Sequence, residues 1–118
     1  MLKLADPVKV YLACGSTDMR KSIDGLAVIV QESFRVDLFS SCLFVFCNKN
    51  RDKLKILQWE HNGFWLYYRR LEKGKFQWPK DDGSSPLAIS ARELGWLLDG
   101  LSLEQQKAHP KVNVSKVI

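Results

Sequence analysis

The sequence predicts an α+β domain in which an antiparallel β-sheet meander packs against two helices on one of its faces. Strand-like segments follow one another through residues 43–78, and a short strand at 8–12 precedes them. Apolar residues recur at helical spacing in 23–35 and 91–99. A strand, a helix, a meander of strands and a second helix, in that order, are typical of the α+β class.

Length and composition indicate one globular domain. The chain has 118 residues, of which 46% are hydrophobic and 26% charged, enough to build a single core. We expect this domain to span 1–101 and a polar, flexible tail to span 102–118. No apolar run approaches the roughly 20 residues that cross a bilayer, and the first residues lack the apolar region of a secretory signal. We therefore expect a cytoplasmic protein with no membrane partner.

The first strand and helix are joined by a short polar turn. Residues 8–12 alternate as a strand does, and 23–35 form an amphipathic helical pattern. Ser22 is a good N-cap residue, and Asp24 lies in the first turn, where the helix dipole favours an acid.

The middle of the chain reads as consecutive strands. The continuous apolar run 43–47 predicts a buried central strand. Residues 53–60 and 64–70 predict a hairpin, with Asn62-Gly63 as its turn, because both turn positions favour positive φ. Residues 76–78 predict a fourth short strand.

The last predicted element is a helix with clear end signals. Turn-forming residues fill 79–86 and a short apolar segment follows them. Ser90 and Glu93 have the spacing of a capping box, and Gly100 is a stop signal, so we expect the helix at 91–99.

Three cysteines, Cys14, Cys42 and Cys47, fit no zinc-binding spacing. We expect reduced and mostly buried thiols. The sequence predicts no metal site and no cofactor.

The positive charge is concentrated in one part of the chain. The net charge is +5, and residues 49–80 contain nine Lys or Arg against three acids, so the rest of the chain is close to neutral. A localised basic surface indicates a polyanionic partner, most often nucleic acid.

Within this block, the predicted hairpin alternates cations with aromatic rings. Cations neutralise phosphates, and rings stack on unpaired bases. The alternative is that the rings fill the core and the cations form a solvated face. The alternation is carried by Lys53, Lys55, Trp59, Trp65, Tyr67 and Arg69.

The stretch Ser-Thr-Asp-Met-Arg-Lys-Ser at 16–22 allows two interpretations. Asp18 can bond to Arg20 or to its own turn while Thr17 or Ser22 caps the helix. Alternatively, Arg20 and Lys21 beside a helix N-terminus form a phosphate-sized site. The sequence does not decide between them, nor whether this turn and the hairpin share one face.

Catalytic signals are weak. The acids are scattered; several lie at helix starts, where capping explains them, and Asp81-Asp82 lies in a turn-forming loop. His61 and His109 have no evident nucleophile or acid partner, and no glycine-rich phosphate loop is present. We therefore expect no catalytic residues and no enzymatic activity.

Three stretches resemble a known family. They are VYLACGSTDMRKSIDGL at 10–26, LFVFCNKNRDKLKILQWEHNGFWLYYRRLEKGKFQWP at 43–79 and ARELGWLLDGL at 91–101. Together they resemble the TnpB-type accessory protein of bacterial insertion sequences of family sixty-six, which is distinct from the RNA-guided nuclease of the same name. The resemblance covers roughly residues 8–101.

The resemblance implies a small protein that works beside a larger transposase, which carries the strand-transfer chemistry. Our hypothesis is a non-catalytic accessory protein that binds DNA through the basic hairpin. The alternative is an adaptor that docks on the larger transposase without binding DNA. The polar positions expected to carry the role are Asp18, Arg20, Lys21, Arg51, Lys53, Lys55, Arg69, Arg70, Lys73 and Lys75. The aromatic contact candidates are Trp65, Tyr67 and Trp78.

Overall fold

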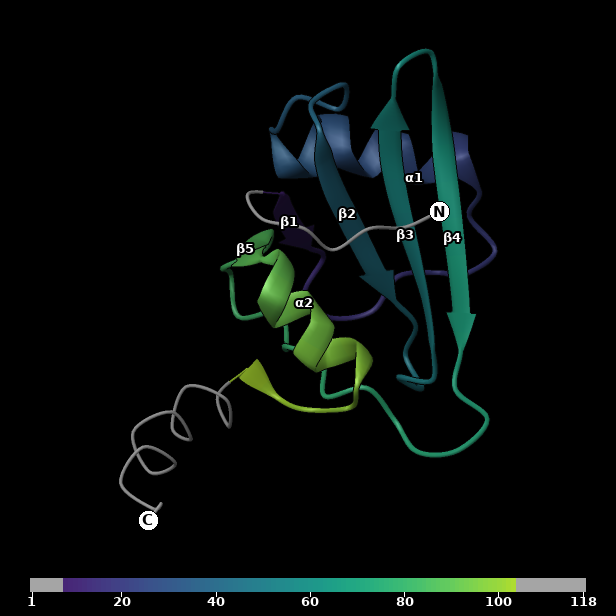
Figure 1. Ribbon diagram of the computed structural model, residues 1–118, viewed down its shortest axis with the longest axis vertical. Coiled ribbons are helices and arrows are strands. Elements are labelled where there is room, and N and C mark those ends of the chain that lie inside the picture. The colour runs from purple at the N-terminus through teal and green to yellow at the C-terminus, as the bar shows by residue number, and fades with distance from the viewer. Residues whose placement is uncertain (1–7, 104–118) are drawn as a thin grey trace.

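Five strands form one open sheet in the order β4-β3-β2-β1-β5 (Figure 1). The structure is a computed structural model and describes residues 8–103. The strands are β1 (Lys9–Leu12), β2 (Cys42–Cys47), β3 (Lys53–Glu60), β4 (Gly63–Arg70) and β5 (Leu87–Ser90). The helices are α1 (Ile23–Ile29), which continues as the π-helical turn η1 (Val30–Phe34), and α2 (Ala91–Leu98).

The α+β class and the mostly antiparallel sheet are confirmed. β2, β3 and β4 form an antiparallel meander, and β5 runs antiparallel to β1. The parallel pair of β1 and β2 was not expected. It arises because the chain crosses over through α1 and η1 between these two strands, and a parallel pair needs such a connection.

The two helices lie on opposite faces of the sheet, so the expectation that both pack on one face is wrong (Figure 1). Leu26 of α1 packs with Phe44 and Phe46, whereas Leu94 of α2 packs with Leu43. All six residues of β2 are buried. A strand buried on both sides needs a cover on each side, which two helices on one face cannot supply.

Both helix starts lie where the sequence places them. Ser22 occupies the N-cap position of α1 in extended conformation, but its side chain makes no capping hydrogen bond. In α2 the predicted capping box is complete, with the Ser90 hydroxyl and the Glu93 side chain each bonded to the other residue's backbone N–H. Gly100 ends this helix at φ +85°, a conformation that favours glycine.

The hairpin turn lies one residue earlier than predicted. β3 and β4 close at the pair Glu60–Gly63, so the loop is His61-Asn62, and His61 has φ +59°. Gly63 is therefore the first residue of β4. This shift changes which residues of the two strands face each other directly.

Residues 76–78 form no strand, but the segment is anchored in the core. Phe76 and Trp78 are buried, and the Trp78 indole N–H donates to the Ala13 carbonyl at 2.9 Å. Only 5% of Trp78 is exposed. Its ring has no free face for a base, so the interpretation of Trp78 as an aromatic contact is wrong.

The expectation of buried thiols is confirmed, because Cys14, Cys42 and Cys47 are free and buried. Burial raises the pKa of the Cys47 thiol to about 11. The predicted tail lies mostly outside the described residues, although Leu103 still packs against the α2-side core. None of the helices in residues 8–103 is long and apolar enough to cross a membrane.

Candidate nucleic-acid interface

The loop at 16–22 and the β3–β4 hairpin meet on the α1 side of the sheet. The Thr17 N–H donates to the Cys47 carbonyl at 2.7 Å, which places the loop at the end of β2. The Lys55 ammonium then donates to the carbonyls of Met19, at 2.7 Å, and Lys21, at 2.8 Å. These bonds answer the question that the sequence leaves open, because they hold the loop and the hairpin on one face.

Asp18 and Arg20 form an ion pair, which is one of the two interpretations that the sequence leaves open. The guanidinium donates to both carboxylate oxygens, at 2.8 to 3.1 Å, and the Arg20 backbone N–H donates to one of them. These bonds, the side-chain ones first, lower the pKa of Asp18 from 3.8 to about 2. The Arg20 side chain stays 91% exposed, so it remains accessible to a partner.

A groove of about 620 Å³ lies between the loop and the hairpin, and we call it the loop groove. The Lys55 ammonium lies 6.0 Å from the centre of the Tyr68 ring, and Tyr68 itself is 55% exposed. The groove therefore combines cations with an accessible aromatic ring. Its lining residues are Asp18, Met19, Arg20, Lys53, Lys55, Leu66 and Tyr68.

Strand alternation divides the predicted hairpin residues between two faces. Lys53 pairs with Arg70 and Lys55 pairs with Tyr68 on the α1 side. Arg69 lies instead on the α2 side, with its strand partner Leu54 in the α2-side core. Paired residues of antiparallel strands project to the same face, and neighbours along a strand project to opposite faces. The alternation of cations and rings in the sequence had predicted a single surface for these residues.

Trp65 and Tyr67 share the α2 side with Arg69. Their rings stack at 6.1 Å with an interplanar angle of 18°. The Trp65 indole N–H donates to the Glu60 carboxylate at 2.7 Å, and the Tyr67 hydroxyl donates to Gln58 at 3.2 Å. Trp65 is 48% exposed and Tyr67 is partly buried against the core, so Trp65 is the more accessible of the two.

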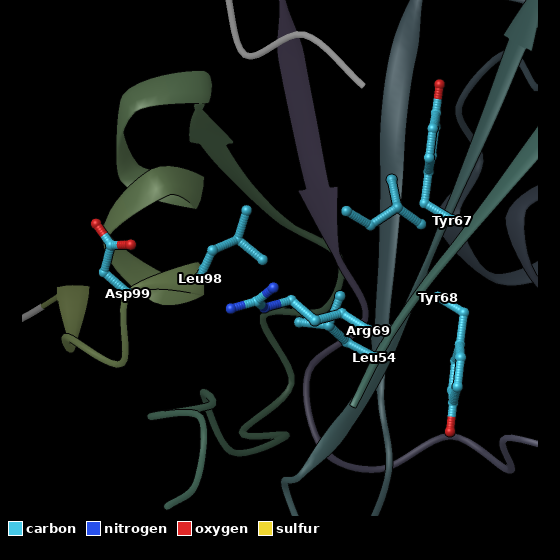
Figure 2. A pocket seen from close by; sticks show the side chains of 7 residues that line it. Leu54, Tyr67, Tyr68, Arg69, Leu98 and Asp99 are labelled. Atoms are coloured by element: carbon cyan, nitrogen blue, oxygen red, sulfur yellow. The ribbon is translucent and has the colours of Figure 1, made fainter. Parts of the chain in front are cut away.

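A second groove of about 390 Å³, the helix groove, separates this side of the hairpin from α2. Figure 2 shows Arg69 reaching from β4 towards Leu98 at the end of α2, while Tyr68 points away from the helix. Leu54 and Ile56 form an apolar floor. Arg69 makes no ion pair with any residue of 8–103. The full lining is Leu54, Ile56, Tyr67, Tyr68, Arg69, Leu98 and Asp99.

The remaining predicted cations lie at the same end of the sheet as the loop groove. The segment after β4 runs beside the β2–β3 turn, because Leu71 N–H donates to the Asp52 carbonyl and Phe76 N–H donates to the Arg51 carbonyl, each at 2.7 Å. This places Lys73 and Lys75 near that turn. We call the whole region the basic end, made up of Arg20, Lys21, Arg51, Lys53, Lys55, Arg70, Lys73 and Lys75.

Tyr68, the exposed ring beside the loop groove, was not predicted as a site residue. It is an even-numbered residue of β4 and therefore projects to the side opposite Trp65 and Tyr67. The correct hairpin turn places it directly across from Lys55. The turn predicted one residue later would pair Lys55 with Arg70 instead. For this reason the contact between Lys55 and Tyr68 was not predicted.

Comparison with known proteins identifies the family. Residues 8–108 match the family described as IS66 Orf2 like protein. The chain belongs to this family. The match includes every described strand and helix and every predicted site residue.

Two relatives from Sinorhizobium fredii (strain NBRC 101917 / NGR234) carry the names uncharacterized protein y4hO and uncharacterized protein y4jC. The first is 37% identical over 101 residues, covering 86% of this chain and 87% of y4hO. The second is 31% identical over 111 residues, covering 93% of each. No solved structure matches significantly.

Family membership supports a role as an accessory protein of an IS66 insertion sequence in transposition. Strand transfer by metal-dependent enzymes needs convergent carboxylates that hold metal ions. In residues 8–103, no group of three or more His, Cys, Asp or Glu side chains could hold a metal ion.

Proposed function

We propose that this IS66 Orf2-like protein is a non-catalytic accessory factor that binds DNA through its basic end. One observation carries the proposal: Lys55 joins the 16–22 loop to the hairpin, so cations from separate segments of the chain share one surface. Cations that come from four segments and converge at one end of a sheet form a surface that fits a polyanion.

The charge balance of this surface supports phosphate binding. Arg20 and Arg70 each pair with a carboxylate and remain largely exposed. Lys21, Lys73 and Lys75 are exposed and make no ion pair with residues of 8–103. Free ammonium groups release counterions from DNA when they contact phosphates, which makes the binding dependent on salt.

Tyr68 adds a contact of a different kind. Its exposed ring beside Lys55 can stack on a base or pack on a sugar. A duplex offers unpaired bases only where it frays or opens, so Tyr68 favours such DNA. Trp65 lies on the other face and takes no part in this surface.

The alternative function, docking on the larger transposase, is favoured by the helix groove. Its apolar floor and the unpaired Arg69 suit a protein segment that carries an apolar residue next to a carboxylate. Under this alternative the two proteins co-purify after nuclease treatment, and Arg69→Ala weakens the complex.

The DNA proposal is tested by fluorescence anisotropy with duplex and single-stranded DNA at several salt concentrations. The double variant Lys21→Ala/Lys53→Ala removes two cations of the basic end. The matched control, Lys9→Ala/Arg92→Ala, removes two cations at the opposite end of the sheet, where β1 and α2 begin. We expect the first variant to bind more weakly and to lower the salt slope by about two, one for each phosphate contact.

The control is expected to retain the wild-type salt slope. Equal losses in both double variants would show that binding follows net charge and not the basic end. Absence of salt-sensitive binding by the wild type would remove the DNA proposal and leave transposase docking.

A further inference from the structure

The outer edge of β4 is long and unpaired. β4 has eight residues in continuous register with β3, and it contains no proline. Within residues 8–103 no backbone group pairs with its outer side. The other edge strand, β5, has only four residues. Natural proteins shorten, bend or cover edge strands because a long regular edge pairs with another chain.

The sequence of β4 is polarised along its length. Phe64 and Trp65 lie near its start, and Arg69 and Arg70 lie at its end. A second copy running antiparallel brings the start of one strand to the end of the other. Rings of one copy then meet cations of the other, whereas a parallel copy would place the arginines side by side.

We propose that β4 pairs with β4 of a second copy, antiparallel and around a two-fold axis at Tyr67, to form one sheet across both copies. In this register Trp65 faces Arg69 of the second copy, and Phe64 faces Arg70 of the second copy. Each pair occurs twice because of the two-fold axis. A cation over an aromatic face is a favourable contact.

The surroundings of Trp65 strengthen this pairing. Glu60 lies on the same face and accepts the indole N–H at 2.7 Å. Arg69 of the second copy therefore meets both a ring and a carboxylate. The register centred on Leu66 would place Trp65 across from Tyr67 and Arg69 across from Gly63, so Arg69 would reach Glu60 but lose its contact with the Trp65 ring.

The backbone is compatible with this register. The closing pair of a two-residue hairpin exchanges hydrogen bonds, so Gly63 bonds inward to Glu60. The N–H and C=O groups that point away from β3 therefore belong to Phe64, Leu66, Tyr68 and Arg70. A two-fold axis at Tyr67 pairs Leu66 with Tyr68 of the second copy, both of which have outward groups.

The proposed pairing also sets how the basic ends of the two copies are oriented relative to each other. A two-fold axis perpendicular to the sheet keeps the α1 face of both copies on the same side, so both loop grooves face in one direction. The pairing itself does not rest on DNA binding. Its tests contain no DNA, so a failure here leaves the proposed function as it stands.

The first test is the mass of the full chain in solution, measured by light scattering and sedimentation. We expect twice the 13.6 kDa of a single chain. Arg69→Glu and Glu60→Arg each place like charges together, and we expect each to weaken the dimer at least about tenfold. The double variant Arg69→Glu/Glu60→Arg restores opposite charges across the interface and is expected to restore the dimer.

The second test fixes the register by disulfide formation. The side chain of Tyr67 faces its own copy across the axis, so Tyr67→Cys is expected to form a linked dimer on mild oxidation. Leu66→Cys is the matched control, and we expect little linkage, because Leu66 faces Tyr68. A monomer at all concentrations, or a dimer insensitive to both single charge reversals, would overturn the proposal. Efficient linkage through Leu66→Cys alone would overturn the register.

Discussion

At the residue scale, the loop at 16–22 depends on a few polar contacts. Asp18 binds Arg20 through the side chain and the backbone, and this bonding holds the pKa of its carboxyl at about 2. This contact is one of the two interpretations that the sequence allows, because Asp readily bonds to the backbone two residues later. Neither residue is buried, so the pair orients Arg20 and adds little to stability.

The Asp18 pair gives a pH-dependent prediction. Because the folded pKa is lower than the unfolded value, the pair stabilises the fold above about pH 4, and this contribution is lost as the pH falls towards 2. Arg20→Ala is expected to raise the pKa of Asp18 towards 3.8, measured by NMR titration of the carboxyl carbon. Lys21→Ala is the control and should shift it much less. An unchanged Asp18 pKa in Arg20→Ala would contradict the observed pair.

Trp78 shows what composition alone does not reveal. Its position within a basic segment suggested a base-stacking ring, but burial and the bond to Ala13 make it a core residue. A single tryptophan in a loop gives no periodicity, so the sequence carries no signal of the side that it faces. Tyr68 is the opposite case, since the alternation of β4 assigns its face once the turn is known.

Trp78→Phe is expected to lower the free energy of unfolding by about 1–3 kcal/mol, because the Ala13 carbonyl loses its buried donor. Urea denaturation measures this change. The salt slope of DNA binding should remain that of the wild type. A weaker salt slope with unchanged stability would return Trp78 to the binding surface.

At the scale of elements, Lys55 connects β3 to the loop that precedes α1. A lysine on a strand near other cations suggested a phosphate contact, but its ammonium is used by two backbone carbonyls. Contacts between residues more than thirty positions apart are not readable from local pattern. The capping box of α2 and the Gly100 stop are local signals, which is why both were predicted correctly.

Lys55→Met is expected to destabilise the protein by about 1–3 kcal/mol, since two carbonyls lose a charged donor. It is also expected to weaken DNA binding by releasing the loop. Lys53→Met is the control on the same strand and face, and its stability should change by less than about 0.5 kcal/mol. Equal stability of the two variants in urea denaturation would show that the Lys55 bonds do not hold the loop.

At the scale of the whole molecule, the sequence predicts the class and most element positions but not how the elements are arranged around the sheet. The continuous apolar run of β2 already indicated a strand buried on both sides. That observation implies a cover on each face, and the structure places α1 and α2 accordingly. Because neighbouring residues of a strand project to opposite faces, some residues of the basic hairpin line the loop groove on one face and others line the helix groove on the other.

The two proposals concern two surfaces of the molecule. The α1 side carries the basic end, which we propose contacts DNA, and the edge of β4 carries the polarised sequence that we propose pairs with a second copy. The two surfaces share Tyr68 and Arg70, but Lys21 and Lys53 belong only to the basic end and Glu60 only to the β4 pairing, so variants of these three residues separate the two proposals. This separation is what makes both proposals testable in the same protein.

The most direct test of the DNA proposal is an NMR titration of the labelled protein with duplex DNA at low salt, followed residue by residue. We expect amide shifts to concentrate in residues 16–22, 49–55 and 68–75, with few at β5 and the start of α2. Raising the salt should reverse them together. Shifts centred on Ile56, Tyr67 and Leu98 in the helix groove, or no shifts under these conditions, would contradict the account.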